Sequence, residues 1–170
     1  IHLAKCLNED DWKAVRRDLD LRPVEGVTGS ESDAGILDKL AKFGITPESV
    51  TLWGTGTPMR EFLWSEEMAD ASVHVLLNVD FKDTYVTGSR DIRNCHINVG
   101  TGKEVSIREV AEIIMKEIGF KGILLWDSSK PDGTMRKLTD VSKLHSLGWH
   151  HKVEIDEGIE RLYKWYLKGV

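Results

Sequence analysis

Two short runs in the 170-residue sequence combine side chains that suit an anionic ligand carrying an aromatic base. The first run, Trp53-Gly-Thr-Gly-Thr-Pro-Met-Arg60, places a flat aromatic ring, two glycines and an arginine on one stretch. Glycine lets a ligand approach the backbone, arginine offers a rigid fork of donors that matches a diphosphate, and tryptophan can stack on a base. This run therefore predicts a site for a base linked to a diphosphate.

The second run, Lys130-Pro-Asp-Gly-Thr-Met-Arg136-Lys137, ends in two adjacent cations. Its Pro-Asp-Gly tripeptide is a turn signal, so we expect the turn to present Arg136 and Lys137 together. Each charged contact to an anion is worth about 1.5–3 kcal/mol when it is partly shielded from water. The second run therefore predicts an anion-binding turn.

Each of these residues also has a simpler structural explanation. Trp53 can be a core residue, because tryptophan is highly buried on average. Arg60 can pair with Glu66 or Glu67 on the surface, in an interaction worth only about 0–1 kcal/mol. The basic pair that ends the second run can be a solvated loop end. Only the combination of the two runs favours the ligand-binding interpretation.

Two Gly-x-Gly turns invite comparison with a dinucleotide-binding site. Gly54-x-Gly56 and Gly100-x-Gly102 both follow predicted strands, but neither has the third glycine of that fingerprint. We interpret them as turn-forming glycines. The sequence contains no Tyr-x-x-x-Lys pair and no His or Cys cluster with metal-ligand spacing. We therefore expect no catalytic residue, no cofactor site and no metal site in this chain.

The elements that must position the two runs alternate between helix and strand. Periodicity and capping residues predict helices at 1–19, 32–43, 65–78, 106–118, 140–145 and 155–167, strands at 50–53, 96–99 and 122–126, and a loop or weak hairpin at 81–94. This alternation is typical of an α/β fold, here with too few strands for a complete doubly wound sheet. The charged stretch before Glu48 suggests an entry helix and inserted lobe over residues 1–48, followed by a ligand-binding domain over 49–170.

Single residues give finer expectations within these elements. We expect Ser65 and Ser106 to cap the helices that they precede. Trp126, Trp149 and Trp165 are expected in the core, and Ile159, Leu162 and Tyr166 are expected to pack on the same helix as Trp165.

The composition is that of an ordinary globular protein, with 41% hydrophobic and 30% charged residues. A net charge of −5 argues against nucleic-acid binding, and no apolar run is long enough to cross a membrane. The two cysteines are far apart in sequence, which favours a reducing, cytoplasmic location. The helix predicted from Ile1 has no capping residue before it, so we expect the sequence to be cut from a longer polypeptide.

Several stretches together resemble the GDP-L-fucose synthase family, within the extended short-chain dehydrogenases and nucleotide-sugar epimerases. The matching stretches are Leu52-Trp-Gly-Thr-Gly-Thr-Pro-Met-Arg-Glu-Phe-Leu63, His96-Ile-Asn-Val-Gly-Thr-Gly102, Lys130-Pro-Asp-Gly-Thr134, Arg136-Lys-Leu138 and Leu144-His-x-Leu-Gly-Trp149. The Trp-Gly-Thr-Gly-Thr-Pro and Lys-Pro-Asp-Gly-Thr runs are the specific ones. Two features depart from the family pattern: Met135 stands where proline is expected, and the lobe before Glu48 is long.

The resemblance implies that this is the small substrate-binding domain of such an enzyme, with the Rossmann domain absent. The family converts GDP-4-keto-6-deoxy-D-mannose to GDP-L-fucose by epimerisation at C3 and C5 and NADPH-dependent reduction at C4. It implies substrate-binding roles for Trp53, Arg60, Asp132 and Lys137, with Arg136 adjacent and Asp132 suited to sugar or ribose hydroxyls. It also implies that NADP(H), the catalytic groups and the homodimer interface belong to the missing amino-terminal domain, so that the chain alone is inactive.

Two other functions remain open from the sequence. The chain can belong to a related epimerase or dehydratase that acts on a UDP- or dTDP-sugar. It can also be a non-catalytic module that binds a nucleotide sugar.

Overall fold

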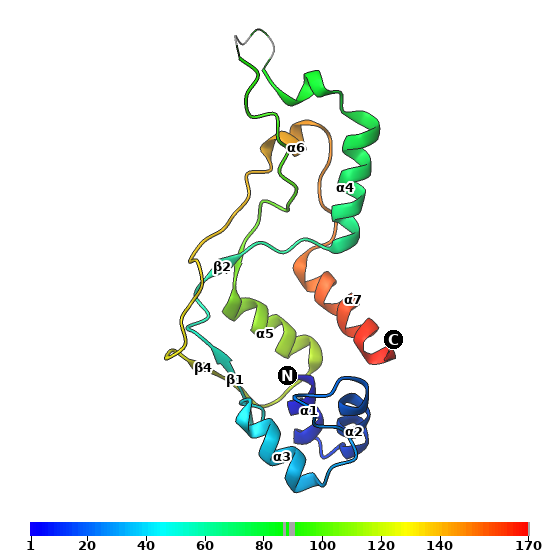
Figure 1. Ribbon diagram of the computed structural model, residues 1–170, viewed down its shortest axis with the longest axis vertical. Helices are drawn as coiled ribbons and strands as arrows, with labels where there is room; N and C mark the ends of the chain where they lie inside the picture. The colour runs from blue at the N-terminus through cyan, green and yellow to red at the C-terminus, as the bar shows by residue number, and fades with distance from the viewer. Residues whose placement is uncertain (87, 89–90, 170) are drawn as a thin grey trace. The chain divides into compact units, whose positions relative to one another are not determined.

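The computed structural model of the protein describes residues 1–86, 88 and 91–169 (Figure 1). Positions 87, 89 and 90, which belong to the predicted 81–94 loop, and residue 170 lie outside the described residues. The described chain is α/β, as predicted, with most of its regular structure in helices. Its contacts divide it into two compact units.

The chain passes between the two units several times. Unit 1 contains residues 1–58, 106–135 and 159–170, and unit 2 contains residues 59–105 and 136–158. The predicted boundary at residue 48 falls inside the first stretch of unit 1 and stays a prediction.

The central feature of unit 1 is a pair of parallel strands. Strand β1 (Ser49–Trp53) pairs with β4 (Ile123–Asp127) so that Trp53 lies opposite Asp127. Helix α5 (Ile107–Ile118) connects to β4 and begins with a capping box, because Ser106 and Glu109 each accept the other's backbone N–H. The strands predicted at 50–53 and 122–126, and the Ser106 cap, are confirmed.

The predicted helix at 1–19 is wrong in one respect, because it is two helices. Helix α1 (His2–Asn8) ends before Asp10, whose φ of 56° is left-handed, and α2 (Trp12–Leu21) follows. The Asp11 carboxylate accepts the Ala14 N–H at 3.0 Å and so starts the second helix. The apolar spacing continues across the break, which is why periodicity alone misses it.

The residues before β1 form the best-packed part of unit 1. Helix α3 (Asp33–Lys42), capped by Ser32 as the sequence predicts, gathers with α1 and α2 (Figure 1). Their shared core consists of Leu3, Cys6, Leu7, Val15, Leu19, Val27, Ile36 and Leu40. The charged 10–48 stretch is therefore a helical lobe whose apolar interior is shared with α1.

Helix α7 (Ile155–Lys168) packs through only part of the predicted set, since Ile159 and Tyr166 are half-buried as predicted. The side chains of Leu162 and Trp165 are 54% and 51% exposed, so the prediction that they pack in the core is wrong. The inward face also makes polar contacts: the Tyr163 hydroxyl lies 3.1 Å from His2 Nδ1, and the Tyr166 hydroxyl donates to Asp18. Hydrogen bonds therefore contribute to the inward face of this helix.

Unit 2 contains α4 (Ser65–Asn78), the short 3-10 helix η1 (Phe81–Thr84) and α6 (Ser142–Ser146). Strand β2 (Met59–Arg60) pairs with β3 (Val105–Ser106), at the positions where the chain passes between units. The predicted strand at 96–99 is wrong, because this segment has no strand assignment. Ser65 is the first residue of α4 and gives it no side-chain cap, so that prediction is also wrong.

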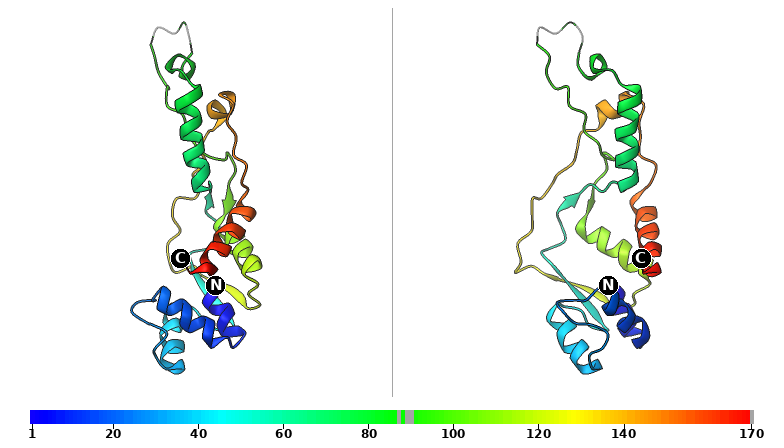
Figure 2. Two further views of the ribbon diagram at one scale, coloured as in Figure 1. Left: turned by 90° about the vertical axis from the view of Figure 1, so that its right-hand side faces the viewer. Right: turned by 45° about the vertical axis from the view of Figure 1, so that its right-hand side comes forward.

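A small core joins the helices of unit 2. Ala71 of α4, Leu144 of α6 and Trp149 are buried together, and Trp149 Nε1 donates to Asp70 at 2.8 Å. Figure 2 shows α4 and α6 lying side by side, in agreement with these contacts. Trp149 is thus a core residue, as predicted.

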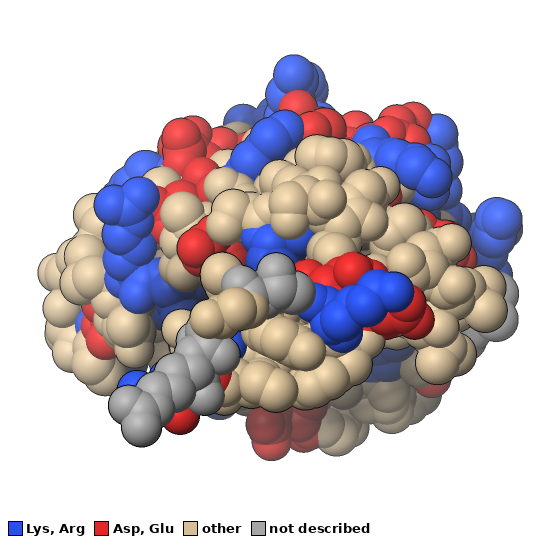
Figure 3. Space-filling model, turned by 90° about the horizontal axis from the view of Figure 1, so that it is seen from above, with Lys and Arg blue, Asp and Glu red and all other residues tan. Residues whose placement is uncertain are grey.

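Charges of both signs are interspersed on the face drawn in Figure 3, where Lys and Arg lie among Asp and Glu. Among residues 1–86, 88 and 91–169, none of the helices combines the length and apolar composition that crossing a bilayer requires.

Candidate functional site

In unit 1 the two predicted runs meet at the turn that follows β1. The Gly54 N–H donates to Asp127 O at 2.9 Å, and the Asp132 carboxylate accepts from Thr55 N at 2.9 Å and Thr55 Oγ1 at 2.6 Å. Gly54 has a φ of +80°, and a Cβ there would overlap Asp132 Oδ1. The hydrogen bonds from Thr55 hold the pKa of Asp132 below its usual range. Asp132 therefore stabilises the turn itself, independently of any ligand.

The other side of this turn is held by Arg108, which the sequence did not single out, and by Trp126, which was predicted only as a core residue. Arg108 donates to Thr55 O at 2.7 Å, and its guanidinium carbon lies 4.5 Å from the centre of the Trp126 ring. Gly56 has a φ of +76°, and a Cβ there would lie 2.6 Å from that ring. Trp126 is half-buried beneath the turn and is not a deep core residue.

Trp53 is not a core residue, which removes the simpler explanation for it. Its side chain is 76% exposed, and Lys130 Nζ lies 5.6 Å from the ring centre. A lysine at this distance makes a cation–π contact and can also reach an anion bound on the same side. Unit 1 thus offers an open aromatic ring beside a cation.

Arg60 lies in unit 2, and its NH1 donates to the Met59 carbonyl at 2.6 Å. Within the described residues the alternative pairing with Glu66 or Glu67 is not found. Glu67 is buried and accepts the Lys152 and Val153 N–H groups, and Glu66 accepts from Trp64 Nε1 at 3.1 Å. The guanidinium of Arg60 is therefore not neutralised by these carboxylates.

Arg136 is held in a defined position, so it is not merely a solvated loop end. Its Nε lies 2.5 Å from Glu104 Oε1, with the Glu104 side chain only 9% exposed and that of Arg136 70% exposed. Pairing through Nε leaves the two terminal nitrogens of the guanidinium to face solvent or a ligand. Lys137, which follows, is exposed.

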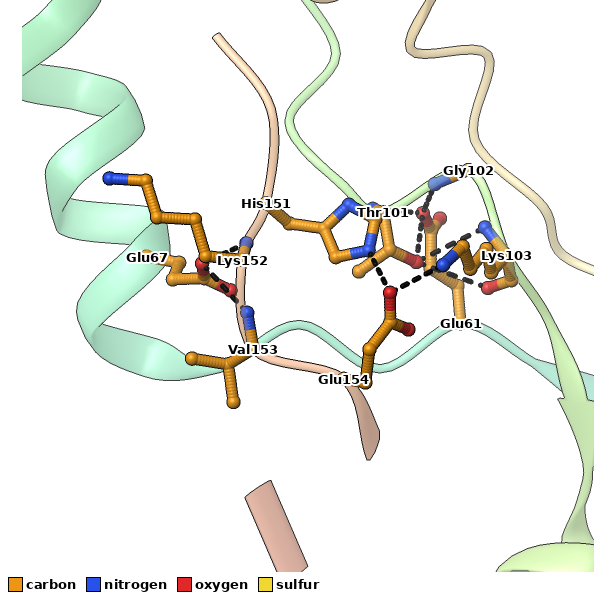
Figure 4. A network of polar contacts seen from close by, with 9 residues as sticks. All are labelled: Glu61, Glu67, Thr101, Gly102, Lys103, His151, Lys152, Val153 and Glu154. Carbon is orange, nitrogen blue, oxygen red and sulfur yellow. Dashed lines mark hydrogen bonds and ion pairs between the residues drawn. The ribbon is translucent and has the colours of Figure 1, made fainter. Parts of the chain in front are cut away.

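A polar network beside Arg60 connects three segments of unit 2 (Figure 4). Glu61 accepts the N–H groups of Thr101 at 2.6 Å, Gly102 at 2.7 Å and Thr139 at 3.1 Å. Burial opposes ionisation of Glu61, but these hydrogen bonds outweigh it and hold its pKa below the usual range. Lys103 and His151 both contact Glu154 on the other side of the same turn.

Comparison with known proteins identifies relatives of this chain. The family model described as "NAD dependent epimerase/dehydratase family" matches residues 21–100. GDP-L-fucose synthase 1 of Arabidopsis thaliana is 50% identical over 123 residues, which are 72% of this chain and 34% of that protein. This chain belongs to the NAD-dependent epimerase/dehydratase family. The resemblance predicted from the sequence is thereby confirmed.

Two solved structures of this family match nearly the whole chain. A GDP-6-OMe-4-keto-L-xylo-heptose reductase from C. jejuni is 40% identical, with a TM-score of 0.85 over 99% of this chain and 45% of that one. MlghC, a GDP-mannoheptose C4 reductase from Campylobacter jejuni with NADP bound, is 38% identical, with a TM-score of 0.81 over 98% and 44%. The chain thus spans about a third to a half of the proteins it matches.

The two Gly-x-Gly turns do not fit the dinucleotide used by this family. A Cβ at Gly54 would overlap the Asp132 carboxylate, and a Cβ at Gly100 would overlap that of Glu61. A carboxylate against each turn repels the pyrophosphate that such glycines otherwise admit. Within the described residues, no group of three or more His, Cys, Asp or Glu is placed to hold a metal ion.

Gly54→Ala is expected to lower the free energy of unfolding by about 2–3 kcal/mol, because the left-handed backbone and the overlap with Asp132 add together. Urea titration followed by tryptophan fluorescence measures the change. Gly26→Ala is the matched control: Gly26 has a φ of +79° with nothing within 4 Å of its Cβ position. That variant should lose only about 1 kcal/mol. Equal losses in both variants would show that Asp132 does not constrain the turn.

Proposed function

We propose that this chain is the substrate-binding portion of an NADP-dependent epimerase-reductase that acts on a GDP-sugar. The observation that carries the proposal is the turn after β1, which Asp132 and Arg108 hold in place while Trp53 stands open at its edge. A pre-formed turn with an exposed ring suits a nucleotide, because little ordering is required when the ligand binds.

The proposed substrate-binding residues are those that the sequence indicated. Trp53 offers its ring to an aromatic base, and Asp132 holds the backbone beside that ring. Arg60, Arg136 and Lys137 supply positive charge for a diphosphate, and Arg136 presents its free edge because Glu104 occupies its Nε. Lys130, which lies near the Trp53 ring, is added to this set by the structure.

The proposed reaction converts GDP-4-keto-6-deoxy-D-mannose to GDP-L-fucose, by epimerisation at C3 and C5 and hydride reduction at C4. Binding of NADP(H) and the proton transfers are assigned to a Rossmann domain outside these 170 residues, because neither glycine turn fits a pyrophosphate and the chain spans only 34% of its Arabidopsis relative. Dimerisation through that domain and a cytoplasmic location belong to the same proposal.

A second substrate class is a GDP-linked 4-keto-heptose, and one observation favours it. The two Campylobacter heptose reductases match 98–99% of this chain in structure, at 38–40% sequence identity. A match of that extent includes most of the helical lobe formed by α2 and α3. Turnover of GDP-4-keto-6-deoxymannose and of a GDP-4-keto-heptose by the intact enzyme distinguishes the two classes.

The purified 170-residue chain is expected to bind GDP at least tenfold more tightly than UDP and to oxidise no NADPH in the presence of a GDP-4-keto-sugar. Calorimetric titration measures the first and loss of NADPH absorbance the second. Tighter binding of UDP would assign the chain to a UDP-sugar enzyme. NADPH oxidation by the chain alone would contradict the placement of the cofactor site outside it.

A further inference from the structure

Glu61 makes more hydrogen bonds to the backbone than any role in a surface ion pair would require. One carboxylate oxygen accepts from Thr101 N and Gly102 N, and the other accepts from Thr139 N. These donors lie 40, 41 and 78 residues away along the chain. A single carboxylate therefore fixes three separate segments of unit 2 to one another, and Figure 4 shows its contacts with Thr101 and Gly102.

The turn that faces Glu61 is shaped to receive it. Gly100 leaves no room for a side chain, because a Cβ there would overlap Glu61 Oε1. Thr101 is buried, and its hydroxyl also lies 3.3 Å from Glu61 Oε1 and donates to Lys103 O at 3.2 Å. Gly100, the first glycine of the Gly100-x-Gly102 turn, thus leaves space for the carboxylate of Glu61.

The cations assigned to the ligand lie close in sequence to Glu61 and to the residues that Glu61 contacts. Arg60 is the last residue of β2 and directly precedes Glu61, so anchoring the Glu61 side chain restrains the backbone from which Arg60 projects. Thr139 lies two residues after Lys137, and Glu104, two residues beyond Gly102, holds Arg136. The 101–104 segment therefore contacts both Glu61, which follows Arg60, and Arg136.

We propose that Glu61 is a positioning residue, which fixes Arg60 and the Arg136–Lys137 arm in the geometry that binds the diphosphate of the ligand. This inference rests on the proposed function, because it requires that these cations hold a nucleotide diphosphate. It assigns Glu61 no contact with the ligand. Its effect is exerted through Arg60 and through the segment that ends at Thr139.

The negative charge and both oxygens of Glu61 are required for this role. In Glu61→Gln one oxygen becomes an NH₂ group, which cannot accept a hydrogen bond. Either the Thr101 and Gly102 N–H groups or the Thr139 N–H group then faces another donor. The substitution keeps the size of the side chain, so it tests the hydrogen bonds without creating a cavity.

The test is calorimetric titration of the 170-residue chain with GDP as the probe. Glu61→Gln is expected to weaken binding about tenfold, and Glu112→Gln, which alters an exposed carboxylate on α5, should leave it unchanged. In an Arg60→Ala background the effect of Glu61→Gln should shrink to threefold or less, because Glu61 acts partly through Arg60. A general loss of folding would not produce this dependence on Arg60.

Hydrogen exchange gives a second measurement that needs no ligand. The amides of Thr101, Gly102 and Thr139 should exchange at least tenfold faster in Glu61→Gln than in the unaltered chain. Unchanged exchange, or unaltered GDP affinity in Glu61→Gln, would overturn the inference while the proposed function stood. An undiminished effect of Glu61→Gln in the Arg60→Ala background would also overturn it. Absence of GDP binding by the unaltered chain would remove the proposed function, and this inference with it.

Discussion

Asp18→Ala is expected to lower the free energy of unfolding by about 3–5 kcal/mol, the largest stability effect we predict for this chain. The Asp18 side chain is 7% exposed and forms an ion pair with Arg22 at 2.7 Å. It also accepts the Tyr166 hydroxyl, at 2.7 and 2.8 Å from its two oxygens. Removing the carboxylate leaves a buried hydroxyl and a guanidinium without their acceptor.

The loss of the Asp18 carboxylate should also weaken the contacts of Arg22 with Tyr166 on α7. Arg22 lies 3.7 Å from the centre of the Tyr166 ring and donates to Tyr166 O at 2.8 Å, so it depends on Asp18 for its position. Burial and the hydrogen bond to Asp18 raise the pKa of Tyr166, as expected for a hydroxyl held as a donor.

Urea titration measures the effect of Asp18→Ala, with Asp38→Ala as the matched control. Asp38 pairs with Lys42 at 2.6 Å on the surface of α3, where both side chains are more than two-thirds exposed. Its removal should cost less than about 0.5 kcal/mol. Similar losses in the two variants would mean that the Asp18 cluster does not hold α7 to α2.

Arg60→Ala is expected to raise the dissociation constant for GDP about 10- to 100-fold, the largest affinity effect that we predict. A charged hydrogen bond to a diphosphate is worth about 1.5–3 kcal/mol, and tenfold in affinity corresponds to about 1.4 kcal/mol. Titration calorimetry measures the change. Among the described residues, the Arg60 side chain donates a hydrogen bond only to the neighbouring Met59 carbonyl. The stability of the chain should therefore be little altered by its removal.

Arg93→Ala serves as the matched control for Arg60→Ala. Arg93 is also in unit 2, is largely exposed and pairs with Asp91 at 3.1 Å. Its removal takes away the same charge without touching the proposed site, so the affinity for GDP should stay within twofold. Equal affinities of the unaltered chain and Arg60→Ala would remove Arg60 from the binding residues.

Local signals in the sequence were sufficient for several elements. Ser106 and Glu109 form the capping box that their spacing predicts, and Gly119 ends α5 with a φ of 79°. Strands β1 and β4 were predicted within one residue of their observed bounds. In each case the residues that decide the structure lie within a few positions of one another.

Other features depend on partners distant in the sequence. The 96–99 segment has the composition of a strand but lacks the neighbouring strand that would make it one. Likewise, the sequence left Trp53 open between a base platform and a core residue and placed Trp126 in the core, whereas in the structure Trp53 is exposed and Trp126 lies beneath Arg108. The role of Arg108 was not predicted, because its hydrogen bond to Thr55 spans 53 residues and no local sequence pattern indicates it.

Because the chain passes between its two units several times, no single cut in the sequence separates one unit from the other. Unit 1 takes both ends and the middle of the sequence, and unit 2 takes the two stretches between them. Neither unit can therefore be expressed as one uninterrupted stretch. The α2–α3 lobe is continuous in sequence, within residues 9–48, but its apolar interior includes Leu3, Cys6 and Leu7 of α1. An exchange of this lobe between relatives would therefore have to include the α1 residues that pack against it.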